Sequence, residues 1–126
     1  MPELAEVEFF RRVWEPAEGL KVIDVSANLE KRIFRNVISK SFPKCLVGTR
    51  LRNSFRKGKQ LCFVFDEYHW LGLHMGMTGN LRYSYDTKEE FKYNYLTVFL
   101  ENDHRLIFQD PRLFGKVLYE HSKEVP

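Results

Sequence analysis

The first three residues, Met1-Pro2-Glu3, place an imino acid and a carboxylate at the start of the chain. Methionine before a small residue such as proline is normally removed during maturation, which would leave Pro2 with a free secondary amine. Such an amine attacks an aldehyde-like carbon and forms an iminium, as lysine forms a Schiff base. The Glu3 carboxylate would lie within reach to move protons to and from a leaving group. Proline also opens many ordinary helices, so the pair equally fits a plain helix start.

Two further segments combine glycine, arginine and large apolar side chains. Residues 74–79 (HMGMTG) predict a tight loop that carries the flexible side chain of Met77 at its tip. Residues 110–115 (DPRLFG) place Arg112 and Phe114 between a proline turn and a glycine. An arginine beside an aromatic wedge is what a protein needs to enter a base stack and fill the gap that a flipped base leaves. A buried methionine and a simple turn around a buried phenylalanine are the alternatives.

The basic residues are unevenly distributed along the sequence. Residues 31–65 hold ten lysines and arginines and no aspartate or glutamate, whereas the rest of the chain has a net charge of −7. The densest part mostly alternates by two, which on a strand would point several cations out of one face: Arg50, Arg52, Arg56, Lys57 and Lys59. This pattern favours a face that binds a polyanion such as a phosphate backbone. A solvated strand pair whose charges only aid solubility is the alternative.

The hydrophobic pattern predicts one helix followed by strands. A helix is expected over residues 3–18, with Leu4, Val7, Phe10 and Trp14 on its apolar face and Glu3 at the same azimuth. Strands are expected over residues 21–29, 49–56, 60–65, 70–73, 80–85, 96–100, 105–108 and 116–119. The second and third of these would form a hairpin around Lys57-Gly58, and residues 86–94 are expected to form a loop.

Short, regularly spaced strands with few helices predict a mainly β (α+β) fold, a β-sandwich or a barrel with an N-terminal helix. Of these we expect a two-sheet antiparallel β-sandwich flanked by the N-terminal helix and a second short helix. A length of 126 residues suits a single domain over residues 1–126.

Composition excludes several classes of protein. With 44% hydrophobic and 29% charged residues, the chain is typical of a soluble globular domain. Two cysteines are too few for a disulfide scaffold or a four-cysteine zinc site. The longest apolar run spans residues 61–65, far short of the roughly 20 residues of a membrane span. The N-terminus lacks a basic flank and an apolar signal core, so we expect a cytoplasmic protein.

Four motifs together resemble the N-terminal domain of the formamidopyrimidine-DNA glycosylase and endonuclease VIII family. They are residues 1–12 (MPELAEVEFFRR), the turn at residues 56–59 (RKGK), residues 74–82 (HMGMTGNLR) and residues 110–115 (DPRLFG). The resemblance covers essentially the whole chain, in the family's order and approximate spacing. It implies a bifunctional glycosylase and abasic-site lyase of base-excision repair. Its partner would be double-stranded DNA that contains oxidised bases or abasic sites, with the protein associated with the nucleoid.

The resemblance also implies a role for individual residues. Pro2 would attack C1′ of the damaged nucleotide, Glu3 would transfer protons, and Glu6 would be a second acidic group near the site. Lys59, at the hairpin turn, would contact a phosphate near the lesion and support catalysis, before the backbone is cleaved by β- and δ-elimination. The remaining DNA contacts would come from the void-filling Met77, Arg112 and Phe114, and from His74, Arg56 and Lys57 in the same motifs.

The sequence departs from the family's pattern in several places. Ala5 replaces a proline that is usual in the opening motif, Met75 stands where leucine is common, and Leu113 stands where a second arginine is frequent. Residues 93–95 (YNY) stand where many relatives carry His-Asp-His, part of which contacts DNA phosphate. We expect this replacement to affect phosphate binding and lesion preference.

Family members continue into a helical domain with a helix–two-turn–helix and usually a four-cysteine zinc finger. Neither is present in these 126 residues. We therefore expect a catalytic-domain piece or a truncated relative with weak activity, with no cofactor in this chain and zinc only in the missing part. A non-catalytic nucleic-acid-binding module that keeps the fold is the main alternative, and a β-sandwich interaction protein is the other. The sequence specifies neither the preferred lesion nor the oligomeric state.

Overall fold

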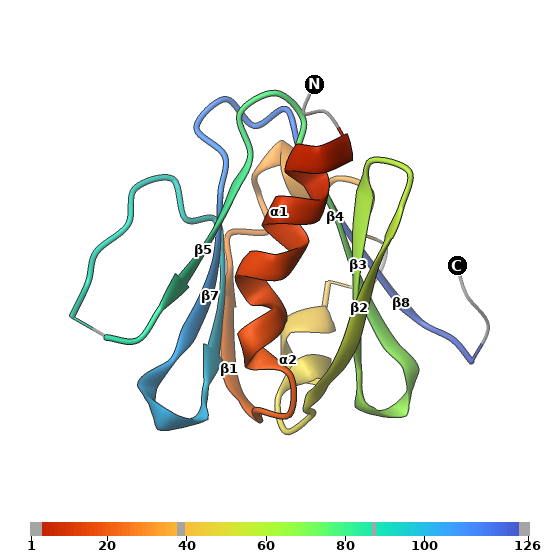
Figure 1. The fold of residues 1–126 in the computed structure, drawn as a ribbon, viewed down its shortest axis with the longest axis vertical. Coiled ribbons are helices and arrows are strands. Elements are labelled where there is room, and N and C mark those ends of the chain that lie inside the picture. Colours follow the sequence, from red (N-terminus) through yellow and green to blue (C-terminus); the bar gives the residue numbers. More distant parts are fainter. Residues whose placement is uncertain (1–3, 38–39, 87, 124–126) are drawn as a thin grey trace.

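The computed structural model describes residues 4–37, 40–86 and 88–123 (Figure 1). In these described residues, two helices and eight strands follow one another in this order: α1 (Leu4–Trp14), β1 (Val22–Ala27), α2 (Phe42–Leu46), β2 (Leu51–Lys57), β3 (Gln60–Phe65), β4 (His69–His74), β5 (Asn80–Ser84), β6 (Leu96–Leu100), β7 (Arg105–Gln109) and β8 (Lys116–His121). Short 3₁₀ turns lie between them: η1 (Glu15–Ala17), η2 (Arg32–Phe34), η3 (Asp66–Tyr68) and η4 (Glu101–Asp103). No helix in the described residues has the length and apolar character that a membrane crossing requires.

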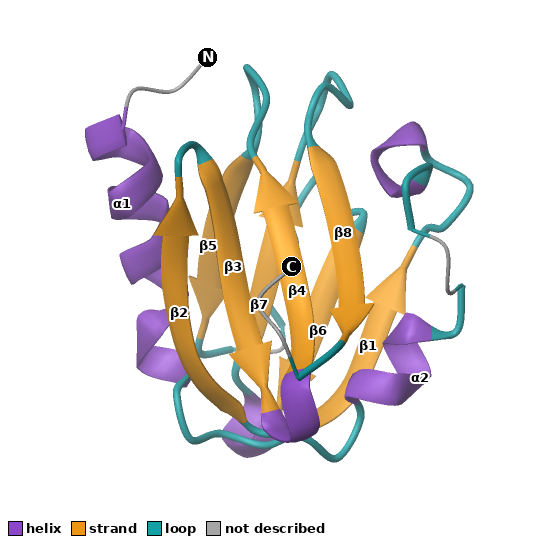
Figure 2. Cartoon of the chain, turned by 90° about the vertical axis from the view of Figure 1, so that its right-hand side faces the viewer, coloured by secondary structure: helices purple, strands orange, loops and turns teal. Residues whose placement is uncertain are grey.

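The strands form two four-stranded sheets that lie face to face, with orders β1-β6-β7-β5 and β2-β3-β4-β8 (Figure 2). Every pairing within them is antiparallel. Alternate side chains of both sheets point inward and form one core, in which Phe63 of β3 and Phe108 of β7 are fully buried. The expected two-sheet antiparallel sandwich is thereby confirmed, and the barrel is not.

The helices cover the two open sides of the sandwich, where edge strands would otherwise be exposed (Figure 1). α1 lies between edge strands β5 and β2. The indole N–H of Trp14 donates to the carbonyl oxygen of Arg82 in β5 (3.1 Å), and Arg11 donates to the hydroxyl of Ser54 in β2 (3.0 Å). On the other side, α2 packs against β1 and η2 packs against β8. The position of α1 is therefore fixed by both sheets at once.

Three expectations at the level of single residues were wrong. The α-helix ends at Trp14 rather than residue 18, because Pro16 lacks an N–H and its ring disfavours a helical residue before it. Leu4 is 47% exposed, so the buried face of α1 is formed by Val7 and Trp14. The turn of the β2–β3 hairpin is Gly58-Lys59, one residue later than expected, because Lys57 still pairs with Gln60.

Candidate functional site

Four segments that are distant in the sequence meet at one end of the sandwich. The start of α1, the tip of the β2–β3 hairpin, the β4–β5 loop and the β7–β8 loop all lie at the upper end in Figure 1. These segments carry eight of the predicted site residues: Glu6, Arg56, Lys57, Lys59, His74, Met77, Arg112 and Phe114. Pro2 and Glu3 lie outside the described residues and directly precede α1.

The β4–β5 and β7–β8 loops are held together by the buried carboxylate of Asp110. Its Oδ1 accepts hydrogen bonds from the Thr78 hydroxyl (2.6 Å) and from the N–H of Leu113 (3.1 Å). Its Oδ2 accepts one from the N–H of Gly115 (2.7 Å). Asp110 has no exposed surface, so these bonds form away from competing water. The carboxylate thus fixes both loops relative to each other.

Backbone contact at Gly76 brings the two loops still closer. Gly76 has a φ of 61°, and a Cβ placed there would lie 2.6 Å from the carbonyl carbon and oxygen of Phe114. Real Cβ atoms do not approach backbone atoms that closely, so only glycine fits.

We expect Gly76→Ala to destabilise the fold by at least about 2 kcal/mol more than Gly58→Ala, because a buried clash with backbone adds to the cost of positive φ. Gly58 is the matched control, since it has a φ of 60° and nothing within 4 Å of the added Cβ. Urea unfolding of both variants measures the difference. Equal losses of stability would mean that the loops do not interlock as described.

The side chains at the tips of these loops are exposed. Met77 is 66% exposed and Phe114 is 41% exposed, so the alternatives in which they are buried are wrong. The guanidinium of Arg112 lies 4.9 Å from the centre of the Phe114 ring. Leu113, between them, has a φ of 59°. Three side chains with large contact surfaces therefore project from a rigid pair of loops.

His74, at the end of β4, is half-buried beside two lysines. Its Nδ1 accepts a hydrogen bond from the N–H of Gly76 (3.1 Å), which leaves the proton of the neutral ring on Nε2. Burial lowers the pKa of His74, and the charges of Lys116 and Lys59 lower it further. A neutral donor therefore lies next to two cations at this end of the molecule.

We expect the NMR titration of the His74 ring to have its midpoint below 6.5, its ordinary value. Because the folded-state pKa lies below that of the unfolded chain, His74 makes folding less favourable as the pH falls below 6.5. Lys116→Ala should raise the midpoint, since it removes a neighbouring positive charge, whereas Lys92→Ala on the exposed 88–95 segment should not. A midpoint at or above 6.5 would contradict the arrangement.

The first two cations of the basic run at residues 50–59 are paired with acidic side chains, so only part of the run is available to a polyanion. Arg50 pairs with Glu101 (3.0 Å), and Arg52 pairs with Asp66, whose pKa is lowered mainly by that hydrogen bond. Both acidic partners come from 3₁₀ turns outside the run, which the sequence spacing of the cations does not show. At the hairpin tip, Arg56 donates to the Gly58 carbonyl oxygen (3.0 Å).

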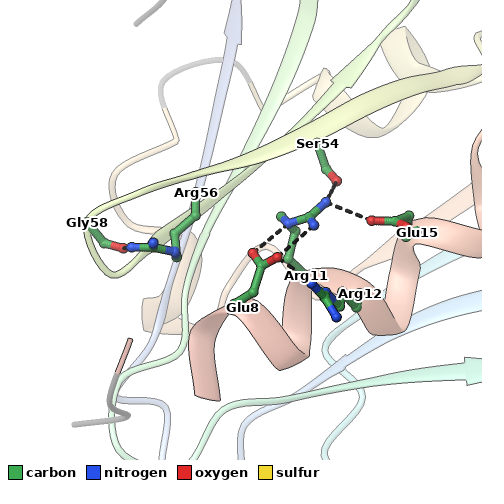
Figure 3. A network of polar contacts seen from close by, with 7 residues as sticks. All are labelled: Glu8, Arg11, Arg12, Glu15, Ser54, Arg56 and Gly58. Atoms are coloured by element: carbon green, nitrogen blue, oxygen red, sulfur yellow. Dashed lines mark hydrogen bonds and ion pairs between the residues drawn. The ribbon is translucent and has the colours of Figure 1, made fainter. Parts of the chain in front are cut away.

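A network on α1 that sequence reasoning missed fixes the helix beside the hairpin (Figure 3). Glu8 accepts hydrogen bonds from Nε (2.7 Å) and Nη2 (2.8 Å) of Arg11, which also donates to Glu15 (2.9 Å). The hydrogen bonds from Arg11, with smaller contributions from its charge and from Arg12, lower the pKa of Glu8 to about 2. The bond from Arg11 to Ser54 joins the last turn of α1 to β2.

No group of three or more histidines, cysteines, aspartates or glutamates in the described residues could hold a metal ion. The features at this end are instead hydrogen-bond donors, cations and exposed apolar side chains.

The comparisons with known proteins agree with one another. Residues 1–117 match the family described as the formamidopyrimidine-DNA glycosylase N-terminal domain. Formamidopyrimidine-DNA glycosylase from Methylococcus capsulatus is 36% identical over 120 residues, which are 94% of this chain and 43% of the relative. A structure of MutM with DNA containing carbocyclic 8-oxo-G has a TM-score of 0.83 at 31% identity and covers 98% of this chain and 46% of its own. A complex of Lactococcus lactis Fpg with abasic-site DNA has a TM-score of 0.83 at 30% identity, over 96% of this chain and 45% of its own. The chain thus spans less than half the length of these relatives.

Proposed function

Because this chain belongs to the formamidopyrimidine-DNA glycosylase family, whose N-terminal domain it matches, we propose that it is the catalytic half of a DNA glycosylase and abasic-site lyase. One observation carries the proposal. The segment that follows Pro2 and Glu3, the cationic hairpin tip and the exposed Met77–Phe114 pair lie at one end of a single rigid sandwich. Residues 1–126 would form one domain that needs no cofactor of its own.

The proposed chemistry starts from the amine of mature Pro2. Its nitrogen forms a bond to C1′ of the damaged nucleotide as the bond from C1′ to the base breaks, and Glu3 moves the protons that the departing base and the opening sugar require. The C1′–O4′ bond then breaks, O4′ takes a proton as the sugar opens, and the iminium that forms makes the C2′ proton acidic. Loss of that proton expels the 3′ phosphate (β-elimination), a second elimination expels the 5′ phosphate, and water then releases the amine. Glu6, exposed on the first turns of α1, supplies a second carboxylate nearby.

The proposed DNA contacts follow from the exposed groups around this amine. Met77, Arg112 and Phe114 would enter the duplex and occupy the space of the extruded base. Phosphates on either side would be bound by the hairpin and by His74, whose Nε2–H is a neutral donor. The hairpin contributes Arg56, Lys57 and Lys59. Such binding to chromosomal DNA would place the protein on the nucleoid.

Borohydride trapping tests the proposal. The protein is mixed with a duplex that carries one abasic site or one 8-oxoguanine, borohydride is added, and covalent complexes are separated on a denaturing gel. We expect an adduct with both duplexes, with more adduct on the abasic one because no base needs to be excised, and none with an undamaged duplex. Binding without any adduct, in a chain whose Met1 is removed, would overturn the enzymatic role and leave a nucleic-acid-binding module.

A further inference from the structure

A cavity of about 200 Å³ lies between η2 and the β7–β8 loop, with Phe114 in its lining. Six residues line it: Arg32, Arg35, Leu113, Phe114, Gly115 and Lys116. Three of the six are cations and none is acidic. The resemblance to the family assigned no role to Arg32, Arg35 or Lys116.

Arg32 connects the cavity to the tip of the loop. Its Nε donates to the carbonyl oxygen of Leu113 and its Nη2 to that of Arg112, both at 2.8 Å. The guanidinium also lies 5.2 Å from the centre of the Phe114 ring. These contacts use two of its five N–H groups, so others remain to serve a ligand. Arg32 therefore supports the loop backbone and the ring while it lines the cavity.

The positive charge of the cavity is not neutralised within the described part of the chain. None of the ion pairs there involves Arg32, Arg35 or Lys116. The carboxylate that contacts the same loop, Asp110, is buried and already accepts hydrogen bonds from Thr78 and the loop backbone. Cations gathered in a hollow that no carboxylate lines raise the local concentration of anions.

We propose that this cavity binds one phosphodiester group of the DNA, contacted by Arg35 and Lys116 and by the remaining N–H groups of Arg32. The proposal rests on the proposed function, since it assumes a DNA duplex at this end of the molecule. A guanidinium fork and an ammonium are the donors that proteins use for phosphate oxygens. Because Arg32 also holds the backbone of Arg112 and Leu113, a phosphate in the cavity and the inserted Phe114 ring are supported by the same side chain.

The salt dependence of binding tests this site. Arg35→Gln with Lys116→Gln should weaken binding to an abasic duplex and lower the slope of log K against log salt by about 1, because the contact with one phosphate is lost. Lys21→Gln with Lys44→Gln is the matched control, since it removes the same charge from the residue before β1 and from α2, neither of which lines the cavity. The control should keep the wild-type slope. An unchanged slope in the first variant would overturn the proposal.

A second experiment uses the unaltered protein and locates the phosphate. Each phosphate of the abasic duplex is replaced in turn by a neutral methylphosphonate, and the affinity is measured for both the wild type and the Arg35/Lys116 variant. At one position the wild type should lose affinity while the variant should not. Equal losses in both proteins at every position would contradict the site. Inorganic phosphate should compete only weakly, because a free ion gains nothing from the neighbouring contacts of the duplex.

Borohydride trapping, run in parallel, separates this site from the catalytic proposal. If the wild type forms a covalent adduct but the Arg35/Lys116 variant keeps the salt slope, the phosphate site in the cavity is rejected and the catalytic role stands. If the variant lowers the slope but the wild type forms no adduct, the phosphate site is supported and the catalytic role is rejected.

Discussion

Replacing Asp110 with alanine is expected to lower the free energy of unfolding by about 3 kcal/mol, because buried donors lose their acceptor. The buried N–H of Gly115 would have no partner in its place, at roughly 1–3 kcal/mol, and the half-buried hydroxyl of Thr78 would lose its partner at about 1 kcal/mol. The N–H of Leu113 loses less, since it also lies 3.2 Å from the backbone oxygen of residue 110. Urea unfolding followed by circular dichroism measures the loss.

Two variants show whether the loss arises from this carboxylate. Thr78→Val removes one of its hydrogen bonds and should cost about 1 kcal/mol. Glu30→Ala removes a carboxylate from an exposed position outside the strands and should change stability by less than about 0.5 kcal/mol. If Asp110→Ala were as stable as Glu30→Ala, the two loops would not depend on the buried carboxylate.

Blocking the N-terminal amine is expected to reduce the borohydride adduct by at least about 10²-fold, since the reaction would lose its nucleophile. Insertion of a lysine between Met1 and Pro2 has this effect, because methionine before a large residue is retained and the proline nitrogen becomes an amide. An amide nitrogen shares its lone pair with the carbonyl group and does not attack carbon. The adduct yield on an abasic duplex is the measurement, with duplex affinity determined alongside.

Glu3→Gln is the matched control for this change, because it keeps the amine and removes only the carboxylate. It should slow release of an oxidised base more than it slows trapping at an abasic site, where no base departs. A blocked chain that still gave the wild-type yield of adduct would place the nucleophile elsewhere.

The fold was predictable because its signals are local. Alternation of apolar and polar residues specified the strands, and the glycine of the β2–β3 turn specified a hairpin to within one residue. Pro16, by contrast, ended α1 earlier than hydrophobic periodicity indicated. Periodicity reports which residues are apolar, whereas the end of a helix depends on one backbone N–H.

The candidate site was predictable only in part, since much of it depends on contacts between distant segments. The exposed Met77 and Phe114 lie where their motifs indicated, at the tips of two neighbouring loops. The connection that Asp110 makes to Thr78 spans 32 positions, and the contact of Arg32 with Leu113 spans 81. No sequence spacing indicates such pairs. For the same reason, the cations Arg50 and Arg52 could not be recognised as already paired.

The most direct test of the proposed chemistry is to identify the atom that carries the trapped DNA. The reduced adduct with an abasic duplex is digested with nuclease and protease, and the modified peptide is sequenced by mass spectrometry. We expect the sugar remnant on the nitrogen of Pro2, in a peptide that begins at residue 2. A remnant on the side chain of Lys59, or of any other lysine, would contradict catalysis by the N-terminal amine.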